Sequence, residues 1–219
     1  MRYKNGFSIE FKLNNTLAYL CGVIIGDGYL RNGTKSKTNL FKNYEIKIEI
    51  VEKEYANFLM KHFKTIVKTK SKIKKIVDKR PNRKIRYSVD IKNKWLYNFF
   101  TNTMDIPSGK KSGKVFIPKK ILKNKNYSRW FIAGLYDTDG GKRGHTIGFT
   151  TKSKRLNIQT SKILYEFKIS HFTERWKNKK YNKEYYGIRL HKHSIDTFLN
   201  TFPLQNINKR GSARVWKMD

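Results

Sequence analysis

The stretch LAYLCGVIIGDG, residues 17–28, has a counterpart later in the chain, RWFIAGLYDTDG at residues 129–140. Aligned without a gap, the two copies place Asp27 on Asp139 and a glycine directly after each acid. Each copy is an apolar stretch of helical length that ends in this acid and glycine. A pattern repeated in this way predicts a chain of two similar halves, each opened by the same kind of helix.

Small residues lie one helical turn apart in both copies. The first copy has Gly22 and Gly26 at these positions, and the second has Gly134 and Thr138. Glycine inside a helix costs about 1 kcal/mol relative to alanine, so a packing contact should offset it. Small residues allow two helix backbones to approach closely. We therefore expect the two motif helices to pack on each other through these faces, with both motif acids at the same end.

Paired acids at the end of two packed helices predict metal chemistry. Two carboxylates at close range repel each other unless a cation lies between them. Mg²⁺ prefers oxygen ligands and retains water and phosphate ligands. Such a site suits phosphodiester hydrolysis, in which bound metal activates water and stabilises the leaving oxygen. Asp27 and Asp139 therefore predict a divalent-cation site that acts on a polyanion.

The overall charge indicates a nucleic-acid partner. The 219 residues include 49 Lys and Arg against 16 Asp and Glu, a formal net charge of +33. An excess of this size is typical of nucleic-acid-binding proteins, although a membrane-surface or ribonucleoprotein role also fits. Aromatic residues at 14% and hydrophobic residues at 38% supply a core, so the chain is not a disordered basic tail.

The cysteine content and the apolar runs bear on the compartment. Cys21 is the single cysteine and forbids an internal disulfide, which fits a reducing compartment. The apolar runs are shorter than the ~20 residues of a membrane span, and the N-terminus lacks a signal-peptide core. We expect an intracellular protein in cytoplasm or organelle matrix that is not secreted and has no membrane partner.

Periodicity predicts the same order of elements twice, helix, two strands, helix, two strands, helix. In the first half we expect helices near 15–26, 52–67 and 93–103, and strands near 28–35, 43–51, 70–78 and 84–92. In the second half we expect helices near 128–138, 153–167 and 194–200, and strands near 144–151, 170–177 and 184–191. The predicted class is α+β: two pseudo-symmetric αββαββα halves, each with a four-stranded antiparallel sheet, packed through the motif helices. The expected boundaries are 1–104 for the first half, 105–127 for a basic linker, and 128–219 for the second half with a C-terminal extension.

Two nine-residue stretches, LCGVIIGDG at 20–28 and IAGLYDTDG at 132–140, resemble the paired LAGLIDADG motifs of single-chain homing endonucleases. The resemblance covers nearly the whole chain, because the order of elements after each motif also matches. It implies a site-specific double-strand DNA endonuclease of the intron type. Such an enzyme works as a monomer on a long non-palindromic DNA site and hydrolyses phosphodiesters with a divalent metal.

The same resemblance implies roles for individual residues. In this family the last acid of each motif binds metal and is catalytic, which assigns that role to Asp27 and Asp139. The implied cofactor is Mg²⁺ or another divalent cation such as Mn²⁺. The carbonyl groups that precede these acids also reach the metal, which implies Gly26 and Thr138 as further metal ligands.

Lysines lie near the metals in this family, and the matching candidates are Lys142 and Lys152, with Lys47 as a weaker one in the first half. Because the chain has so many basic residues, these lysines also fit a purely chance placement. The family's first acid position, usually structural, is Ile25 in the first copy and Asp137 in the second. The alternative for the two motif acids is a purely structural role, as helix-terminal acids beside glycine turns. That alternative is unfavourable, because an acid at a helix C-terminus opposes the macrodipole.

DNA contacts are expected on the strands. A strand of ~9 residues spans about 30 Å, enough to follow about nine base pairs in the major groove. We expect DNA-binding side chains on the solvent faces of the two sheets: Arg31, Asn32, Lys35, Glu45, Lys47, Glu49, Arg83, Arg86 and Ser88 in the first half, and Arg143, His145, Thr146, Arg175, Lys177, Tyr185 and Arg189 in the second. The halves differ at nearly all of these positions, so the target should be non-palindromic.

Other functions stay open from the sequence. Asp27 with Glu45 and Lys47 resembles the D…(D/E)-x-K arrangement of restriction-type nucleases, although that reading leaves Asp139 unexplained. An intron RNA maturase, a non-cleaving nucleic-acid-binding protein of the same fold, and a structural protein of a ribonucleoprotein are further alternatives. His191 and His193 form an H-K-H pair that is a weaker metal candidate. From the start at methionine and the end at Lys-Met-Asp, we expect a chain without an intein splicing junction.

Overall fold

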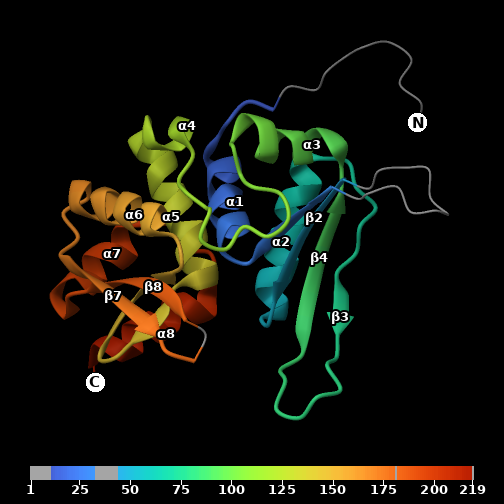
Figure 1. Cartoon of the computed structure of the whole chain (residues 1–219). Coiled ribbons are helices and arrows are strands. Elements are labelled where there is room, and N and C mark those ends of the chain that lie inside the picture. Colours follow the sequence, from blue (N-terminus) through green and yellow to red (C-terminus); the bar gives the residue numbers. More distant parts are fainter. Residues whose placement is uncertain (1–10, 33–43, 181, 219) are drawn as a thin grey trace.

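The protein is described from a computed structural model that covers residues 11–32, 44–180 and 182–218, with the backbone alone described for 214–218. Figure 1 shows two halves side by side, with helices α1 and α5 between them. The first half contains α1 (Asn15–Gly26), β1 (Gly28–Asn32), β2 (Tyr44–Ile50), α2 (Lys53–Ile66), β3 (Lys74–Ile76), β4 (Arg86–Lys92), α3 (Lys94–Asn98) and a π-helical turn (Phe99–Thr103).

The second half follows the same order of elements. It contains α5 (Lys125–Asp139), β5 (Gly141–Arg143), β6 (Thr146–Thr151), α6 (Lys154–Glu166), β7 (His171–Asn178), β8 (Lys183–Leu190), a 3-10 turn (Lys192–Ser194), α7 (Ile195–Thr201) and α8 (Ile207–Met218). Between the halves lies the short helix α4 (Lys119–Leu122). In the described residues no helix combines the length and the apolar character that a membrane span requires.

The two sheets have the same topology. Their strand orders are β1-β2-β4-β3 and β5-β6-β8-β7, and all neighbouring strands are antiparallel. The predicted α+β class of two αββαββα halves with four-stranded antiparallel sheets is confirmed. The domain boundaries stay a prediction; within the expected linker 105–127, Val115, Ile117 and Ile121 are buried. The tail after residue 203, expected only as an extension, forms helix α8.

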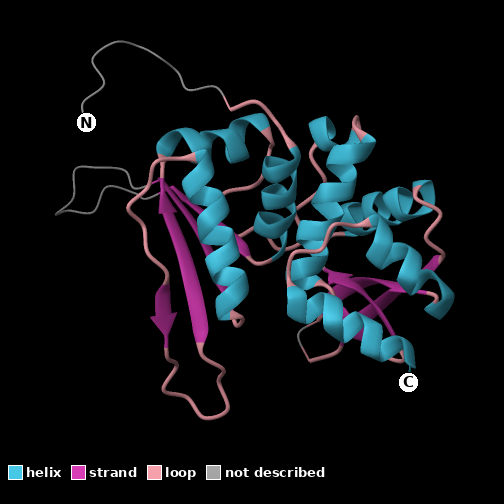
Figure 2. Cartoon of the chain, turned by 180° about the vertical axis from the view of Figure 1, so that it is seen from behind, coloured by secondary structure: helices cyan, strands magenta, loops and turns pink. Residues whose placement is uncertain are grey.

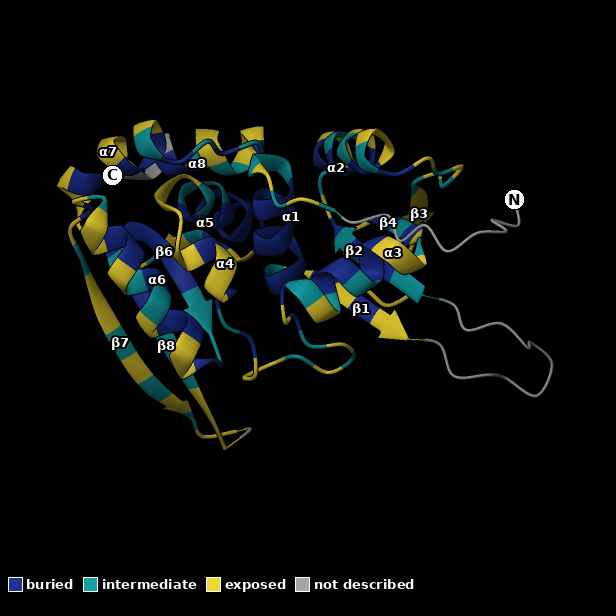
Figure 3. Cartoon of the chain, turned by 90° about the horizontal axis from the view of Figure 1, so that it is seen from above, coloured by how far each residue is buried: buried dark blue, intermediate teal, exposed yellow. Residues whose placement is uncertain are grey.

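Helices α1 and α5 pack backbone against backbone. Each begins at an asparagine cap: the Asn14 Oδ1 accepts from the Leu17 N–H at 2.9 Å, and the Asn124 Oδ1 accepts from the Tyr127 N–H at 3.0 Å. A β-carbon on Gly22 would lie 2.2 Å from the carbonyl oxygen of Phe131, so the helices meet without an intervening side chain. Figure 3 shows both helices largely in dark blue, the colour of buried residues.

Each sheet has one buried face and one open face. In the first sheet Ile46, Ile48 and Ile91 point to the core, which helix α2 covers. In the second sheet Ile147 and Ile188 do so under helix α6. Seen from behind, the helices of both halves lie in front of the strands (Figure 2). Because side chains alternate along a strand, the neighbours of these isoleucines define the open face of each sheet.

Candidate metal and nucleic-acid site

The two motif acids lie at the joint end of the packed helices. Asp27 caps the C-terminus of α1, where its N–H donates to the Val23 carbonyl at 3.1 Å, and Asp139 is the last residue of α5. A β-carbon on Gly26 would lie 3.4 Å from the Asp139 Cγ, and 2.1 Å from the Thr138 Oγ1. The close approach of the helices therefore brings the two carboxylates to one place.

A lysine from the segment between the halves reaches this end of α1. The Lys111 ammonium donates to three successive carbonyl oxygens, those of Ile24, of Ile25 at 2.5 Å and of Gly26 at 2.6 Å. These carbonyls lack partners within the helix and carry its negative dipole end, so they attract a cation. Burial lowers the pKa of Lys111 to about 8. The negative charge of Asp139 acts to raise this pKa, but its effect is smaller.

A second lysine approaches from the C-terminal helix. The Lys209 ammonium of α8 donates to the carbonyl oxygen of Gly140, the residue that follows Asp139. Lys111 and Lys209 both act to lower the pKa values of Asp27 and Asp139. Two ammonium groups thus flank two carboxylates at the end of the helix pair.

Removal from water changes the pKa values of the two acids more than the two lysines do. Asp27 and Asp139 both keep an exposed surface at the joint end of the helices, so solvent still reaches the two acids. Removal from water raises the pKa of Asp27. The pKa of Asp139 rises to about 6, first because of removal from water and second because of the charge of Asp27. The charged pair is therefore unfavourable by itself, and a further cation would relieve it.

A pocket of about 230 Å³ opens beside Asp139. Its lining includes Gly26, Lys111 and Asp139 from the centre of the molecule, and Thr150, Lys152 and Tyr185 from the second half. The Lys152 ammonium lies 5.3 Å from the centroid of the Tyr185 ring. The pocket thus joins Asp139 to the open face of the second sheet.

The donor set fits a divalent cation. It consists of two carboxylates and the backbone carbonyls at the ends of two helices, all of them hard oxygen ligands. The carbonyl of Gly26 already accepts from a cation, the Lys111 ammonium. In the described ranges no group of three or more His, Cys, Asp or Glu side chains could hold a metal, at this site or elsewhere, so backbone carbonyls would have to complete the ligand set here. His191 and His193 stack with ring centroids 5.5 Å apart.

The other lysines predicted near the metals are placed differently. Lys152 lines the pocket, whereas Lys142 is exposed on β5 opposite Ile147 and is not among the residues that line it. Lys47 forms an ion pair with Glu49 at 2.6 Å. Sequence reasoning missed Lys111 and Lys209, because their contacts are to backbone carbonyls far away in the chain and no local pattern marks them.

Asp27, Glu45 and Lys47, the alternative catalytic group, do not come together in the structure. Gly28, next to Asp27, pairs with Ile48, whereas Glu45 pairs with Arg31. Three residues along a strand correspond to about 10 Å, so Glu45 lies well away from the motif acid.

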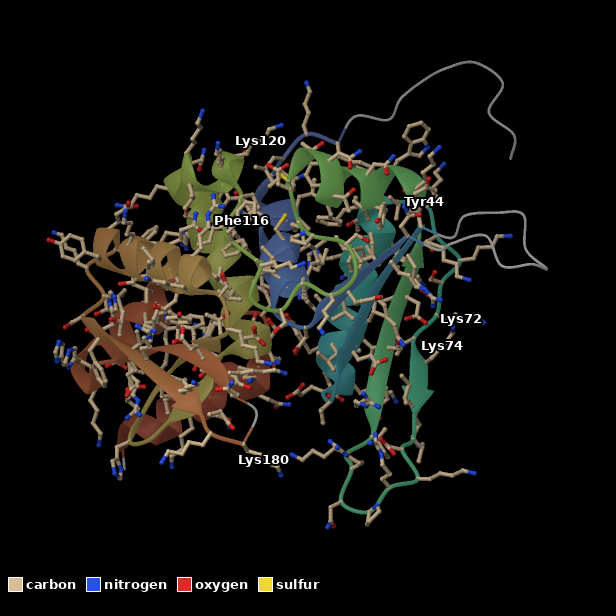
Figure 4. All side chains as sticks on the ribbon, in the orientation of Figure 1. Tyr44, Lys72, Lys74, Phe116, Lys120 and Lys180 are labelled. Atoms are coloured by element: carbon tan, nitrogen blue, oxygen red, sulfur yellow. The ribbon has the colours of Figure 1, made fainter. Side chains whose placement is uncertain are left out.

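The open face of the first sheet carries Arg31, Glu45, Lys47, Glu49 and Arg86, as the register shows. The Arg86 guanidinium donates to the Glu49 carboxylate at 2.6 Å, so this face holds acids as well as bases. Lys74 on β3 extends it at the outer edge, near Lys72 (Figure 4), and lies 3.1 Å from the Asp90 carboxylate.

Three of the predicted DNA-binding residues in the first half have other surroundings. Ser88 is buried and donates to the Asp90 carboxylate at 2.5 Å. Asn32 pairs with Tyr44 and so lies on the opposite face from Arg31. Arg83 is exposed in the loop between β3 and β4, and Lys35 lies outside the described residues.

In the second sheet the open face carries Arg143, Tyr185 and Arg189. The Arg143 guanidinium lies 5.2 Å from the Trp176 ring centroid, and Trp176 stacks on Tyr185 at 5.8 Å. The Arg189 guanidinium lies 2.8 Å from the Glu174 carboxylate. These contacts hold the long side chains in place along the sheet.

The remaining predicted DNA-binding residues of the second half lie elsewhere. Arg175 and Lys177 pair with Tyr186 and Glu184, which places them on the opposite face from Tyr185. Thr146 is buried and donates to the Leu190 carbonyl at 2.7 Å, and His145 lies exposed in the turn before it. The expectation that all of these side chains share one solvent face is therefore corrected. Strand register puts Arg175 and Lys177 on the other face, whereas Thr146 pairs with Arg143 but is buried.

Two motif helices that pack through glycine, end in paired acids and each open an αββαββα half define the two-motif LAGLIDADG architecture. Residues 126–203 match the family model of the LAGLIDADG-like domain. The second half thus matches the LAGLIDADG-like domain in sequence, and the whole chain has the fold of the single-chain homing endonuclease I-DmoI.

Solved structures and a curated relative show the same likeness. The homing endonuclease I-DmoI, in complex with DNA and Ca, has a TM-score of 0.66 and 22% identity over 92% of this chain and 97% of its own. I-WcaI, bound to its DNA recognition sequence, has a TM-score of 0.57 and 16% identity over 91% and 85%. The replication factor C small subunit of Methanocaldococcus jannaschii is 31% identical over 87% of this chain, but the chain spans only 10% of that relative's length.

Proposed function

We propose that this protein is a divalent-metal-dependent DNA endonuclease that makes a double-strand break at a long, non-palindromic site. The observation that carries the proposal is the joint end of α1 and α5, where Asp27 and Asp139 lie between the ammonium groups of Lys111 and Lys209. I-DmoI, which shares the fold, has been solved with its target DNA and Mn, Mg or Ca. This supports a divalent cation as the cofactor and double-stranded DNA as the partner.

The metal would be held by the Asp27 and Asp139 carboxylates, with the carbonyls of Gly26 and Thr138 as further ligands. Bound there, a divalent cation supplies an activated water and charge stabilisation for the leaving oxygen. The chain's own residues do the rest. Lys111 and Lys209 place positive charge beside the scissile phosphates, where negative charge develops during hydrolysis. Lys152, at the pocket beside Asp139, would bind a phosphate oxygen of the substrate.

The open faces of the two sheets would bind the DNA on either side of the metal site. Arg31, Arg86, Arg143 and Arg189 present guanidinium groups there, and Arg is well suited to guanine in the major groove. The side chains on the two open faces differ, which supports a target without a palindrome. Since the chain supplies both halves of the fold, we propose that it acts as a monomer, encoded as an intron-type homing enzyme.

Incubation with a randomised duplex DNA library, followed by mapping of the ends, tests the proposal. Defined ends should appear with Mg²⁺ or Mn²⁺ and disappear with EDTA. Asp27→Asn and Asp139→Asn should each abolish the double-strand break while target binding stays within about tenfold, because affinity comes from the strands. The matched control, Asp196→Asn on α7, should cleave normally.

Two results would contradict the proposal. Cleavage by the Asp27→Asn, Asp139→Asn double variant at the normal rate would remove the motif acids from the chemistry. Absence of cleavage in every duplex, together with tight binding to a structured intron RNA, would favour the maturase alternative instead.

A further inference from the structure

We propose that Asp137 is a positioning residue, which holds the C-terminal segment from Gln205 onward so that Lys209 reaches the metal site. This inference rests on the proposed function only in the consequence for cleavage; the contact itself is structural. It assigns a role in the active site to a segment that lies outside both repeated αββαββα units.

Asp137 is buried in α5, two residues before Asp139, with 1% of its surface exposed. Its Oδ2 accepts two hydrogen bonds, from the Tyr19 hydroxyl at 2.6 Å and from the Gln205 N–H at 2.7 Å. A buried carboxylate with these two partners connects α1, α5 and the tail at one atom. In the first motif the equivalent position is Ile25, so the chain has this connection in one half only.

The next residue of the tail is fixed from the same place. The Asn206 side-chain amide donates to the Asp137 backbone carbonyl at 3.2 Å, and Asn206 is itself buried at 2% exposure. Its Oδ1 accepts from the Lys209 N–H at 3.3 Å, which makes Asn206 the N-cap of α8. The start and the direction of α8 are therefore set at Asp137.

Helix α8 then carries Lys209 to the end of α5. From the first turn of this helix the Lys209 ammonium donates to the Gly140 carbonyl, beside Asp139. A long, flexible lysine gains a defined position only when its helix is fixed. The buried contacts at Asp137 fix the start of the helix, and Lys209 follows these contacts by only a few residues.

The second hydrogen bond to the Asp137 carboxylate comes from the first half. The Tyr19 hydroxyl lies 2.7 Å from the Tyr55 hydroxyl, so a chain of polar groups runs from α2 through α1 to Asp137. Removing the Tyr19 hydroxyl would weaken this chain without touching the bond to the Gln205 N–H. Tyr19→Phe is therefore a matched control that perturbs the same carboxylate from the other side.

Hydrogen exchange of the free protein, without DNA or metal, tests the contact directly. Asp137→Ala removes the acceptor for Gln205, and Asn206→Ala removes the second contact and the helix cap. Both variants should show faster exchange over residues 205–213 than the wild type, while Tyr19→Phe should not. Asp137→Asn, which keeps an acceptor oxygen, should restore part of the protection. Unchanged exchange in both alanine variants would overturn the proposal, whether or not the protein cleaves DNA.

Single-turnover cleavage then tests the consequence. Asp137→Ala should slow cleavage about tenfold to a hundredfold, as small misplacements of active-site groups do, with target binding nearly unchanged. The Asp137→Ala, Lys209→Met double variant should cleave no more slowly than Lys209→Met alone, because the aspartate acts through the lysine. Loss equal to the product of the two single effects would overturn the positioning role.

Discussion

Gly22 and Gly134 each lie against the backbone of the other's helix. A β-carbon on Gly22 would come within 2.2 Å of the Phe131 carbonyl oxygen, and one on Gly134 within 2.1 Å of the Tyr19 carbonyl oxygen. No real β-carbon fits at these distances, so any larger residue would push the helices apart. The two glycines therefore set the separation of α1 and α5, and with it the separation of the acids at their ends.

We expect Gly22→Ala and Gly134→Ala each to lower the free energy of unfolding by about 1–3 kcal/mol, as overpacking of a core does. This is the expected net loss, after the helix-propensity gain of about 1 kcal/mol from replacing glycine by alanine. Urea denaturation measures the effect. Gly211→Ala in α8 is the matched control, because open space surrounds that position and the change should be neutral or stabilising. Wild-type stability of the Gly22→Ala variant would contradict the close contact.

Lys111→Met and Lys209→Met should each reduce cleavage by about tenfold to a thousandfold, since each removes a positive charge beside the developing negative charge. Binding of the target should change much less. Lys142→Met, measured in parallel under single-turnover conditions, separates two explanations. If contact with the carbonyls beside the motif acids identifies the active lysines, Lys142→Met will cleave faster than the other two variants. If the family resemblance identifies them, Lys142→Met will be equally slow.

The raised pKa of Asp139 makes a prediction about stability and pH. Its value rises from 3.8 in the unfolded chain to about 6 in the folded protein, so the folded state binds a proton more tightly. The stabilisation from this proton is present below pH 4 and is lost as the pH rises through 6. In EDTA, Asp139→Asn should therefore be more stable than wild type at pH 7.5, by an amount on the order of 1 kcal/mol after solvent screening.

That difference should vanish below about pH 3, where Asp139 is protonated in both states. Thermal unfolding at a series of pH values measures it. Mg²⁺ at pH 7.5 should stabilise the wild type more than the variant, because the cation relieves the charged pair. An Asp139→Asn variant less stable than wild type at pH 7.5 in EDTA would show that the ionised pair is already compensated.

Binding to the target DNA should weaken steeply with salt. A net charge of +33 and guanidinium groups on both open faces provide for contact with many phosphates. If ~8 phosphates are neutralised, the slope of log K against log salt should be about −7. Fluorescence anisotropy at several salt concentrations gives this slope. A value near zero would exclude a surface that follows the DNA backbone.

Much of the fold was predictable because its signals are local. The glycines and acids of the two motifs predicted the paired helices, and the alternation in YEIKIEI and RYSVDIK predicted strands that became β2 and β4. Short elements such as β5 and α4 have too few residues for a periodic signal. The tail has a helical pattern, but its packing on the second half is tertiary, so α8 was missed as a functional element.

The sequence allowed the meeting of the two motif acids to be predicted, but not the two lysines beside them. Asp27 and Asp139 stand out in a chain with few acids and a repeated motif. Lys111 and Lys209 are two among 49 basic residues, and what distinguishes them is proximity to carbonyls of remote helices. The prediction of which side chains lie on the open faces was wrong in part. A one-residue error in strand register moves a side chain such as Arg175 to the other face.

The backbone-to-backbone contact of α1 with α5 has a consequence for how such a chain changes over time. Main-chain atoms opposite glycine make this joint, so it depends little on which other side chains surround it. The strands that would read DNA belong to separate sheets on either side of the joint. Each half is thus free to diverge in its recognition surface, and chimeras that combine halves from different relatives should retain the joint while acquiring a hybrid target.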